Sequence, residues 1–398
     1  MSFFFKVYGK YLYKRDTFFA TLAVFIVIAL IGLIPLNPKI LNPIKTALKD
    51  FQFNDLAYAK LGKNNYTKSD DRIVIVNVGW LDRQQIGYLI SQIDAARPSA
   101  IGLDVQFSEP RDPSSDSFLS NVLLKTQNLV SASKLVWQED TVEQKGYFYN
   151  SSSIYGYVNF IGEEKSTIRS FSPFEKHNGK LINSFSAALV KTVHPKAYQK
   201  LFSRNREVET IHYRRSSNKF FILNGDDVIR SQMNQNVFRD KIVLIGYINK
   251  ARYDIEDKHF TPMNQQFAGR SLPDMNGVLI HANIISMILD RNYISKMPGW
   301  LTWIITILLA WIHVVVFIRY FIEKHMWFHF VAKLAQIASA IFFIYLSILL
   351  FHFFSYIIDI KMPIIVIVLA VDVIYFYEAI ALWLHKKWGY NTIFNSKH

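Results

Sequence analysis

Two acidic residues bracket the end of a predicted strand and could take part in ligand binding. Asp104 and Glu109 lie at and just beyond the apolar stretch 100–106. In open α/β sheets, ligands bind outside the carboxyl ends of the strands. Alternatively, Asp104 caps or braces the turn at 108–110, and we favour this structural role.

A second group of polar residues could bind a cation or an anionic ligand. Asp257, His259 and Thr261 are close together in the sequence and could approach His281 in space. A zinc site, however, needs about four ligands with defined geometry, and the two histidines do not have a known metal-binding spacing. We therefore expect no metal, and we favour His281 as a hydrogen-bonded histidine on a helix that faces a sheet.

The remaining polar candidates give no indication of catalysis. Asn159 and Asn283 are candidate ligand contacts, although we expect them to hold backbone groups instead. The chain has no cysteine, which excludes a thiol nucleophile and a thiolate metal site. No Ser–His–acid triad and no pair of catalytic carboxylates can be argued from spacing. We expect a protein without enzymatic activity and without a cofactor.

Two further acids lie within an apolar segment near the C-terminus. Asp372 is about ten residues into the segment 362–384, and Glu378 lies about 9 Å further along a helix, on another face. An ionised acid in the middle of a bilayer costs several kcal/mol unless it is paired or neutral. We expect no basic residue deep in a helix, so Asp372 is either protonated within the bundle or paired with another subunit. An internal hydrogen bond, a partner contact and proton movement remain open interpretations.

The composition indicates that part of the chain lies in a membrane. The chain has 398 residues, of which 51% are hydrophobic and 15% aromatic, and its formal net charge is +14. Four apolar runs are long enough to cross a hydrocarbon core of about 30 Å. The predicted transmembrane helices are 17–38, 297–318, 334–358 and 362–384. The first run lacks the small-residue cleavage pattern of a signal peptide.

Basic residues near the ends of these helices predict the orientation. They are concentrated in 1–16, in the loop 319–333 and in the tail 385–398, so the positive-inside rule places both termini in the cytoplasm. The segment 39–296 then lies outside a bacterial inner membrane, away from nucleic acid. We expect the clusters Arg204/Arg206 and Arg214/Arg215 to form a solvated face, or else a contact with acidic lipid or glycan.

The segment 39–296 predicts one α/β domain. Apolar β-branched runs indicate buried strands, and apolar residues at helical spacing indicate helices between them. The predicted strands are 73–78, 100–106, 129–133 and 241–246, and the predicted helices are 84–96, 114–125, 184–193 and 273–290. This alternation is typical of a mostly parallel sheet flanked by helices. The middle of the segment, 137–235, is more polar and hairpin-like.

Five motifs in this segment resemble the second-type CHASE domain, an extracellular sensory domain associated with cyclases and histidine kinases. They occur in the expected order at 100–110, 156–160, 238–246, 257–262 and 277–283. One apolar helix before the domain and three after it are similar to the family's usual membrane arrangement.

The chain also departs from the family's pattern. Val76, Asn77 and Val78 replace the acidic pair that usually ends the first strand, and Trp80 is followed by Leu and Asp rather than by Pro. No catalytic output domain is recognisable, since only 385–398 follow the last predicted helix.

We therefore expect a non-enzymatic inner-membrane sensor or adaptor that passes the state of its external domain to a separate protein through its membrane helices. The alternative is a structural subunit of a multi-protein envelope complex, and an ion-driven machine using Asp372 and Glu378 is a weaker third interpretation. The expected partners are the lipid bilayer and a membrane or envelope protein, with a second copy of the chain as a further candidate. Whether a small-molecule ligand exists is left open.

Overall fold

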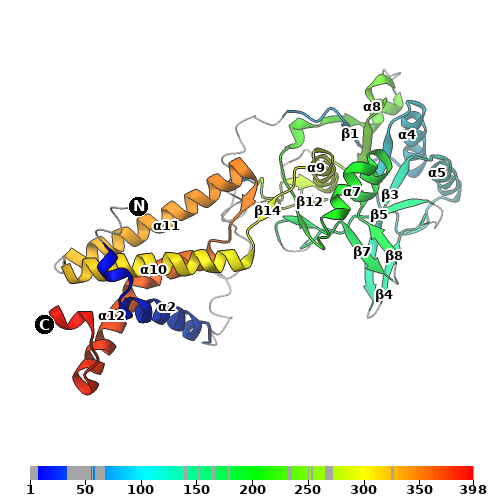
Figure 1. The fold of residues 1–398 in the computed structure, drawn as a ribbon. Helices are drawn as coiled ribbons and strands as arrows, with labels where there is room; N and C mark the ends of the chain where they lie inside the picture. The colour runs from blue at the N-terminus through cyan, green and yellow to red at the C-terminus, as the bar shows by residue number, and fades with distance from the viewer. Residues whose placement is uncertain are drawn as a thin grey trace. The chain divides into compact units, whose positions relative to one another are not determined.

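The computed structural model divides the chain into two compact units, which are described separately (Figure 1). One unit comprises Met1–Lys49 and Ser295–His398, and the other comprises Asp50–Ile294 and is called the α/β domain below. The structure describes residues 8–33, 55, 57–58, 68–138, 141–149, 153–162, 166–177, 180–230, 235–249, 251, 254–264, 272–323 and 327–397.

A seven-stranded sheet forms the centre of the described part of the α/β domain. Its strands are β1 (Ile73–Asn77), β2 (Ala100–Asp104), β3 (Leu129–Gln138), β4 (Thr141–Lys145), β5 (Ile154–Tyr157), β10 (Phe221–Asn224) and β11 (Ile242–Gly246). The order is β10-β1-β11-β2-β3, with both β4 and β5 paired to β3. Every pairing is parallel except that of β3 with β4. The predicted mostly parallel α/β sheet is confirmed.

Shorter elements surround this sheet. Three two-stranded pairs are β6 (Ser170–Phe171) with β9 (Glu209–Thr210), β7 (Phe174–His177) with β8 (Lys180–Asn183), and β12 (Lys258–His259) with β13 (Met275–Asn276). The helices are α4 (Arg83–Ala95), α5 (Pro113–Lys125), α6 (Phe185–Val193), α7 (Pro195–Ser203), α8 (Gly225–Arg230) and α9 (Gly277–Asp290). Single 3-10 turns occur at Ser217–Lys219 and Gln235–Val237.

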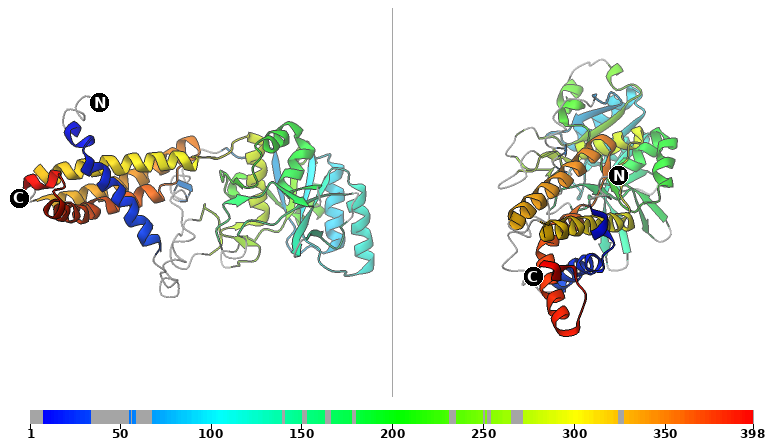
Figure 2. Two further views of the ribbon diagram at one scale, coloured as in Figure 1. Left: turned by 60° about the horizontal axis from the view of Figure 1, so that its bottom comes forward. Right: turned by 60° about the vertical axis from the view of Figure 1, so that its left-hand side comes forward.

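Helices cover both faces of the sheet, as Figure 2 shows. Alternate residues of a strand point to opposite faces. Val74 and Val76 of β1 therefore pack with α4, α5 and α8, whereas Ile73 and Ile75 pack with α6, α7 and α9. Because both faces are buried, the central strands need apolar side chains at nearly every position. This requirement explains the continuous β-branched runs in the sequence.

Local signals explain where the helices begin. Asp82 and Gln85 form a reciprocal capping box at the start of α4, and Asp112 caps α5 ahead of Pro113. Helix α9 begins at Gly277, later than predicted, because Met275 and the following residue pair with β12. Strand β3 is longer than predicted because its second half forms a hairpin with β4.

The second unit contains four helices that are long and apolar enough to cross a membrane. They are α2 (Arg15–Leu33), α10 (Gly299–Glu323), α11 (Phe328–Phe354) and α12 (Lys361–Trp388). One precedes the α/β domain and three follow it, as predicted from the sequence. A short parallel pair, β14 (Ser295–Lys296) with β15 (Tyr356–Ile357), joins the segments before α10 and before α12.

The buried carboxylate of Asp16 ties the C-terminal segment to the start of α2. Its Oδ1 accepts hydrogen bonds from the hydroxyl groups of Tyr377 (2.7 Å), Tyr390 (3.1 Å) and Thr392 (3.3 Å). Its Oδ2 accepts one from the backbone N–H of Ile393 (2.9 Å), at the start of the final 3-10 turn (Ile393–Lys397). The two ends of the described chain are therefore held together by one acid.

Candidate functional site

Three neighbouring strands end side by side at the carboxyl edge of the sheet. Asn77 of β1 is level with Gly246 of β11, which is level with Asp104 of β2. The Asn77 Oδ1 accepts hydrogen bonds from the backbone N–H groups of Gly79 (3.1 Å) and Ile248 (2.8 Å). Asn77 therefore braces the loops that follow β1 and β11. This is a structural role at a position where the family usually carries acids.

The two acids predicted for this edge have different surroundings. Asp104 is half-buried, and a Cβ atom built on Gly246 would lie 3.4 Å from the Asp104 Cβ. The side chain of Glu109 is exposed, and its backbone carbonyl accepts a hydrogen bond from Arg83 Nη2 (2.6 Å). Ligand binding by these carboxylates, and the bracing role favoured for Asp104, both remain predictions.

Aromatic and acidic groups extend the same edge. Trp80 is 85% exposed, and its ring centroid lies 6.4 Å from that of Tyr247, just after β11. Burial, followed by the negative charges of Glu256 and Asp254, raises the pKa of Tyr247. An exposed ring beside several carboxylates suits a cationic or neutral ligand better than an anion.

The two candidate histidines both pack against one aromatic ring. The imidazole of His281 stacks on Phe160 at 4.7 Å, and that of His259 meets the same ring edge-on at 5.4 Å. His281 is 3% exposed, and its Nδ1 lies 3.1 Å from Ser186 Oγ. Burial, and then the nearby His259, lower the pKa of His281 to about 3. His281 is thus a neutral, hydrogen-bonded residue of the core.

Asp257 and Thr261 both hold the start of α9. The Asp257 Oδ2 accepts a hydrogen bond from the first helical N–H, that of Gly277 (3.3 Å). Thr261 donates its backbone N–H and its hydroxyl to the two carboxylate oxygens of Asp274, at 2.8 and 2.6 Å. Burial raises the pKa of Asp274 to about 6, although the bonds from Thr261 oppose this shift. The described residues contain no group of three or more possible metal ligands.

The two candidate asparagines hold backbone segments. Asn159 accepts from the N–H of Leu135 (2.8 Å) and donates to its carbonyl (3.1 Å). Asn283 is 1% exposed; its Oδ1 accepts from the N–H groups of Arg214 and Arg215, and its Nδ2 donates to the carbonyls of Arg215 and Leu279. Both side-chain amides therefore hold backbone segments inside the fold.

A network of charges surrounds the other end of α9. Asp70 Oδ2 accepts from Ser286 Oγ (2.5 Å) and Arg72 Nη2 (2.7 Å), and Arg215 Nη2 lies 3.6 Å away. Asp290, the last helical residue, contacts Arg72 at 2.8 Å and Arg215 at 3.5 Å. We call these five residues the charge clamp. Burial alone would raise the pKa of Asp70, but the hydrogen bonds from Arg72 and Ser286 lower it to about 2.

The predicted solvated face of arginines is wrong for most of its members. Arg215 is 7% exposed and belongs to the charge clamp, and Arg214 contacts Asp290 at 3.0 Å. Arg204 lies 2.5 Å from the buried Glu209 and stacks over Tyr293. Arg215 and Arg204 face the buried carboxylates of Asp70 and Glu209. A buried charge without a partner is costly, which explains why these two cations are not solvated.

In the membrane unit, Asp372 has a basic partner that the sequence prediction overlooked. Lys333 Nζ lies 2.8 and 2.9 Å from its two carboxylate oxygens. The sequence predicts a loop over 319–333 that includes Lys333, but α11 already begins at Phe328. The side chains of Lys333 and Asp372 are 52% and 46% exposed. A contact of Asp372 and Glu378 with a partner remains a prediction.

The chain thus combines an α/β domain that is covered on both faces of its sheet with four helices of membrane-spanning length. The model of the CHASE2 domain family matches residues 40–320, which is more than half of the chain. The chain therefore belongs to the CHASE2 family, whose domain is an extracellular sensory domain. The predicted resemblance is confirmed. No curated protein and no solved structure matches the chain.

Proposed function

We propose that this chain is a non-enzymatic sensor or adaptor of a bacterial inner membrane. Its α/β domain binds a ligand or a protein on the outer side and passes the bound state to a separate partner through the membrane helices. The observation that carries the proposal is helix α9, which links the carboxyl edge of the sheet to the segment entering α10.

Helix α9 is suited to transmit a displacement along its length. Every residue from Gly277 to Ile288 is buried, so the helix is confined by close packing and moves as one body. Val278 lies directly beside Gly246 at the carboxyl edge, and Asp290 lies in the charge clamp. The chain then enters the membrane unit at Ser295 and α10 at Gly299. A shift at the carboxyl edge is therefore carried by α9 as far as Asp290, from which residues 291–298 lead into α10.

The ion pair between Lys333 and Asp372 supports a contact with a partner. Asp372 is about 16 Å along α12 from Lys361, within the apolar part of the helix. Charged groups are costly against lipid, and they normally face protein or water inside a membrane. Since both side chains are about half exposed in the single chain, we infer that a separate membrane protein or a second copy covers them.

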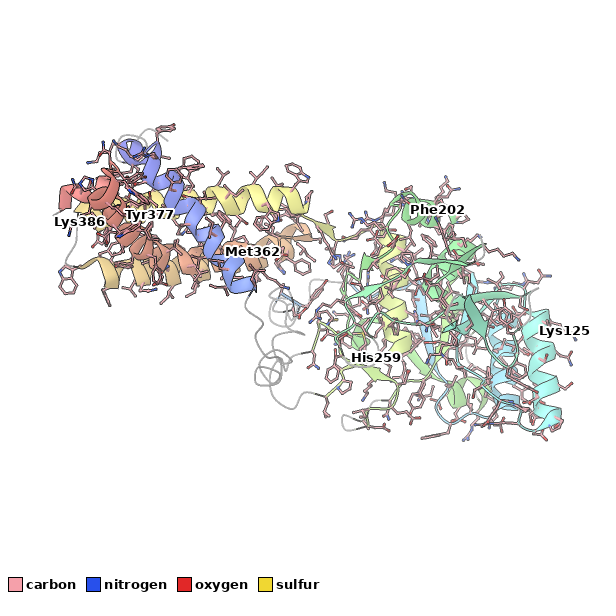
Figure 3. All side chains as sticks on the ribbon, turned by 90° about the horizontal axis from the view of Figure 1, so that it is seen from below. Lys125, Phe202, His259, Met362, Tyr377 and Lys386 are labelled. Atoms are coloured by element: carbon pink, nitrogen blue, oxygen red, sulfur yellow. The ribbon has the colours of Figure 1, made fainter. Side chains whose placement is uncertain are left out.

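The proposed orientation is tested by labelling single cysteines, for which the natural chain without cysteine is an ideal background. Lys125 at the end of α5 and Lys386 in α12 are exposed and are labelled in Figure 3. A membrane-impermeant maleimide should label Lys125→Cys but not Lys386→Cys in intact spheroplasts, and both after permeabilisation. Labelling of Lys386→Cys in intact spheroplasts would contradict the orientation.

The partner is tested by crosslinking in native membranes followed by purification in a mild detergent. We expect wild type to carry a crosslinked partner that Asp372→Leu loses, whereas the matched control Asp359→Asn, at an exposed acid before α12, retains it. A signalling protein as partner favours the sensor, and an envelope assembly favours the structural alternative. Recovery of the chain as an uncrosslinked single species would exclude both.

A further inference from the structure

A groove of about 500 Å³ lies on the surface of the α/β domain, and the residues considered for ligand binding above do not line it. One wall is α5, which contributes Ser117 and Ser120. The other wall is the segment before and within β5, which contributes Tyr147, Tyr149 and Tyr155. Sites for small molecules generally have volumes of about 300–1,000 Å³. The groove is therefore large enough for a ligand.

The aromatic wall is held in place before any ligand arrives. The ring centroids of Tyr149 and Tyr155 are 4.8 Å apart, and those of Tyr147 and Phe148 are 4.7 Å apart. The Tyr155 hydroxyl donates to the carbonyl of Phe148 (2.5 Å), and the N–H of Tyr147 donates to the carbonyl of Phe107 (2.7 Å). Tyr147 and Tyr149 nevertheless remain 41% and 43% exposed. A fixed, accessible ring surface binds with little loss of entropy.

The groove carries no uncompensated charge among its lining residues. Its one charged side chain, Asp116, accepts hydrogen bonds from Arg83 Nη1 (2.5 Å) and the backbone N–H of Arg111 (2.9 Å). Arg83 is 7% exposed and lies 5.3 Å from the ring centroids of Phe107 and Tyr147, so its charge is enclosed as well. Among the described lining residues, a phosphate, a carboxylate or an ammonium group would therefore find no free counter-charge. The ligand that fits is neutral.

Hydroxyl groups supply the polar contacts. Ser117 and Ser120 are one helical turn apart, so they lie on the same side of α5, and Ser153 faces the groove from the other wall. Within the described ranges, the hydroxyl groups of these three serines and of Tyr149 make no hydrogen bond. A ligand that presents hydroxyl groups can both donate to them and accept from them.

We propose that this groove binds a neutral carbohydrate chain. A pyranose ring has an apolar face that can stack on Tyr149 and Tyr155, and its rim of hydroxyl groups can pair with Ser117, Ser120 and Ser153. Tyrosine combines a large apolar ring with a polar tip, which matches this mixed chemistry. The inference deepens the proposed function by naming a ligand class, and it rests on that function only for the exposure of the domain to glycans outside the cell.

The test uses the full chain in a detergent without a sugar headgroup, because alkyl glycosides would compete for the groove. Cellotetraose, maltotetraose and chitotetraose are titrated separately by calorimetry. We expect at least one to bind, with about tenfold weaker affinity for Tyr149→Ala, which corresponds to about 1.4 kcal/mol. Tyr149→Phe, which retains the ring, should lose less. Ser120→Trp, which fills the groove, should abolish binding.

Tyr88→Ala is the matched control, because Tyr88 is a 48% exposed tyrosine that packs on Phe118 and does not line the groove. It should bind as wild type does. Thermal unfolding of each variant confirms that the α/β domain remains folded. If none of the three tetrasaccharides binds, or if Tyr149→Ala and Ser120→Trp bind unchanged, the inference is wrong. If no sugar binds but the crosslinked partner is retained, the sensor proposal stands and only the carbohydrate inference fails. If a sugar binds but no partner is found, the carbohydrate inference stands and only the sensor proposal fails.

Discussion

The two ends of α9 are held by opposite kinds of interaction. At the charge clamp, the acids Asp70 and Asp290 face guanidinium groups of Arg72 and Arg215. At the other end, the exposed Asp274 accepts hydrogen bonds from the backbone N–H and the hydroxyl group of Thr261. The pKa of Asp70 is accordingly lowered to about 2, whereas that of Asp274 is raised to about 6.

This difference indicates which end of α9 changes its charge with pH. A buried carboxylate surrounded by cations remains ionised over the physiological range, so the charge clamp keeps its charges. The pKa of about 6 at Asp274 places this carboxyl group near the balance between its two protonation states at mildly acidic pH. We infer that pH alters the charge beside the carboxyl edge of the sheet but not the charge at the other end of α9.

Removing one member of the charge clamp should have the largest effect. Asp70→Ala leaves the buried Arg215 without its nearest buried acid, and breaking a buried pair typically costs about 3–5 kcal/mol. We expect a loss of this size in the free energy of unfolding of the α/β domain, measured by urea denaturation of the full chain.

Two further variants show whether charge is responsible. The double variant Asp70→Leu/Arg215→Met replaces the pair by apolar side chains, so it should be less destabilised than Asp70→Ala. Asp226→Ala breaks an ion pair between two exposed side chains, Asp226 (54% exposed) and Arg230 (81% exposed). This change should lower the free energy of unfolding by less than about 1 kcal/mol. Equal losses in Asp70→Ala and Asp226→Ala would mean that the charge clamp does not anchor α9.

The protonation of Asp274 should give the second largest effect. Its pKa is raised above the ordinary value of 3.8, so it favours folding at low pH and loses this contribution as the pH rises through about 6. The stability of wild type relative to Asp274→Asn should therefore fall between pH 4 and pH 6, by about 1–2 kcal/mol, since solvent screening at this exposed side chain reduces the full effect of the shift. Urea denaturation at several pH values measures this difference.

Asp70 should show the reverse dependence. Its pKa is lowered, so its contribution is present above about pH 4 and disappears as the pH falls towards 2. Comparing wild type with Asp70→Asn should give a stability difference that grows as the pH rises through this range. If the stability of wild type relative to the Asp→Asn variant changed with pH in the same direction for both acids, the distinction between the two ends of α9 would be wrong.

Close packing where α9 meets the carboxyl edge of the sheet should have an intermediate effect. A Cβ atom on Gly246 would lie 2.9 Å from Val278 of α9, which is too close without movement. We expect Gly246→Ala to lower the free energy of unfolding by about 1–3 kcal/mol through overpacking. Gly277→Ala is the matched control, since its Cβ would meet Asp257 at 3.5 Å, an ordinary contact. A stable Gly246→Ala variant would show that α9 is not tightly seated on the sheet.

Much of this architecture is encoded in local sequence patterns, but its charge pairs are not. The β-branched run at β1 and the apolar stripe of α4 predict buried elements because side-chain period and burial are directly linked. The charge clamp joins positions that are far apart in the sequence, so spacing could not reveal it. A signal existed, however: Asn283, Ser286 and Asp290 form a polar stripe on the apolar α9, and such a stripe requires partners.

The same reasoning explains the other omissions. The pairing of Lys333 with Asp372 does not follow from hydropathy, because hydropathy predicts the apolar centre of α11 but not its polar first turns. The tyrosine groove depends on α5 meeting the segment before β5, a contact that no local pattern determines. Asn159 and Asn283 were correctly expected to hold backbone groups, since buried amides need two or more partners to offset their loss of water.

The smallest expected effect concerns Asp257, where the backbone adopts a left-handed conformation with φ of 53°. Its carboxylate accepts from the first N–H of α9, where a negative charge interacts favourably with the helix dipole. Asp257→Asn retains an acceptor and a residue type that tolerates this conformation, so it should cost only about 0.3–1 kcal/mol. Asp257→Ala loses the acceptor as well and should cost about 1–2 kcal/mol.

Urea denaturation distinguishes these values, and raising the salt concentration should reduce only the charge-dependent part. A loss above about 3 kcal/mol in Asp257→Asn would place a strong charge interaction at this end of α9 too, and the contrast with the charge clamp would then fail.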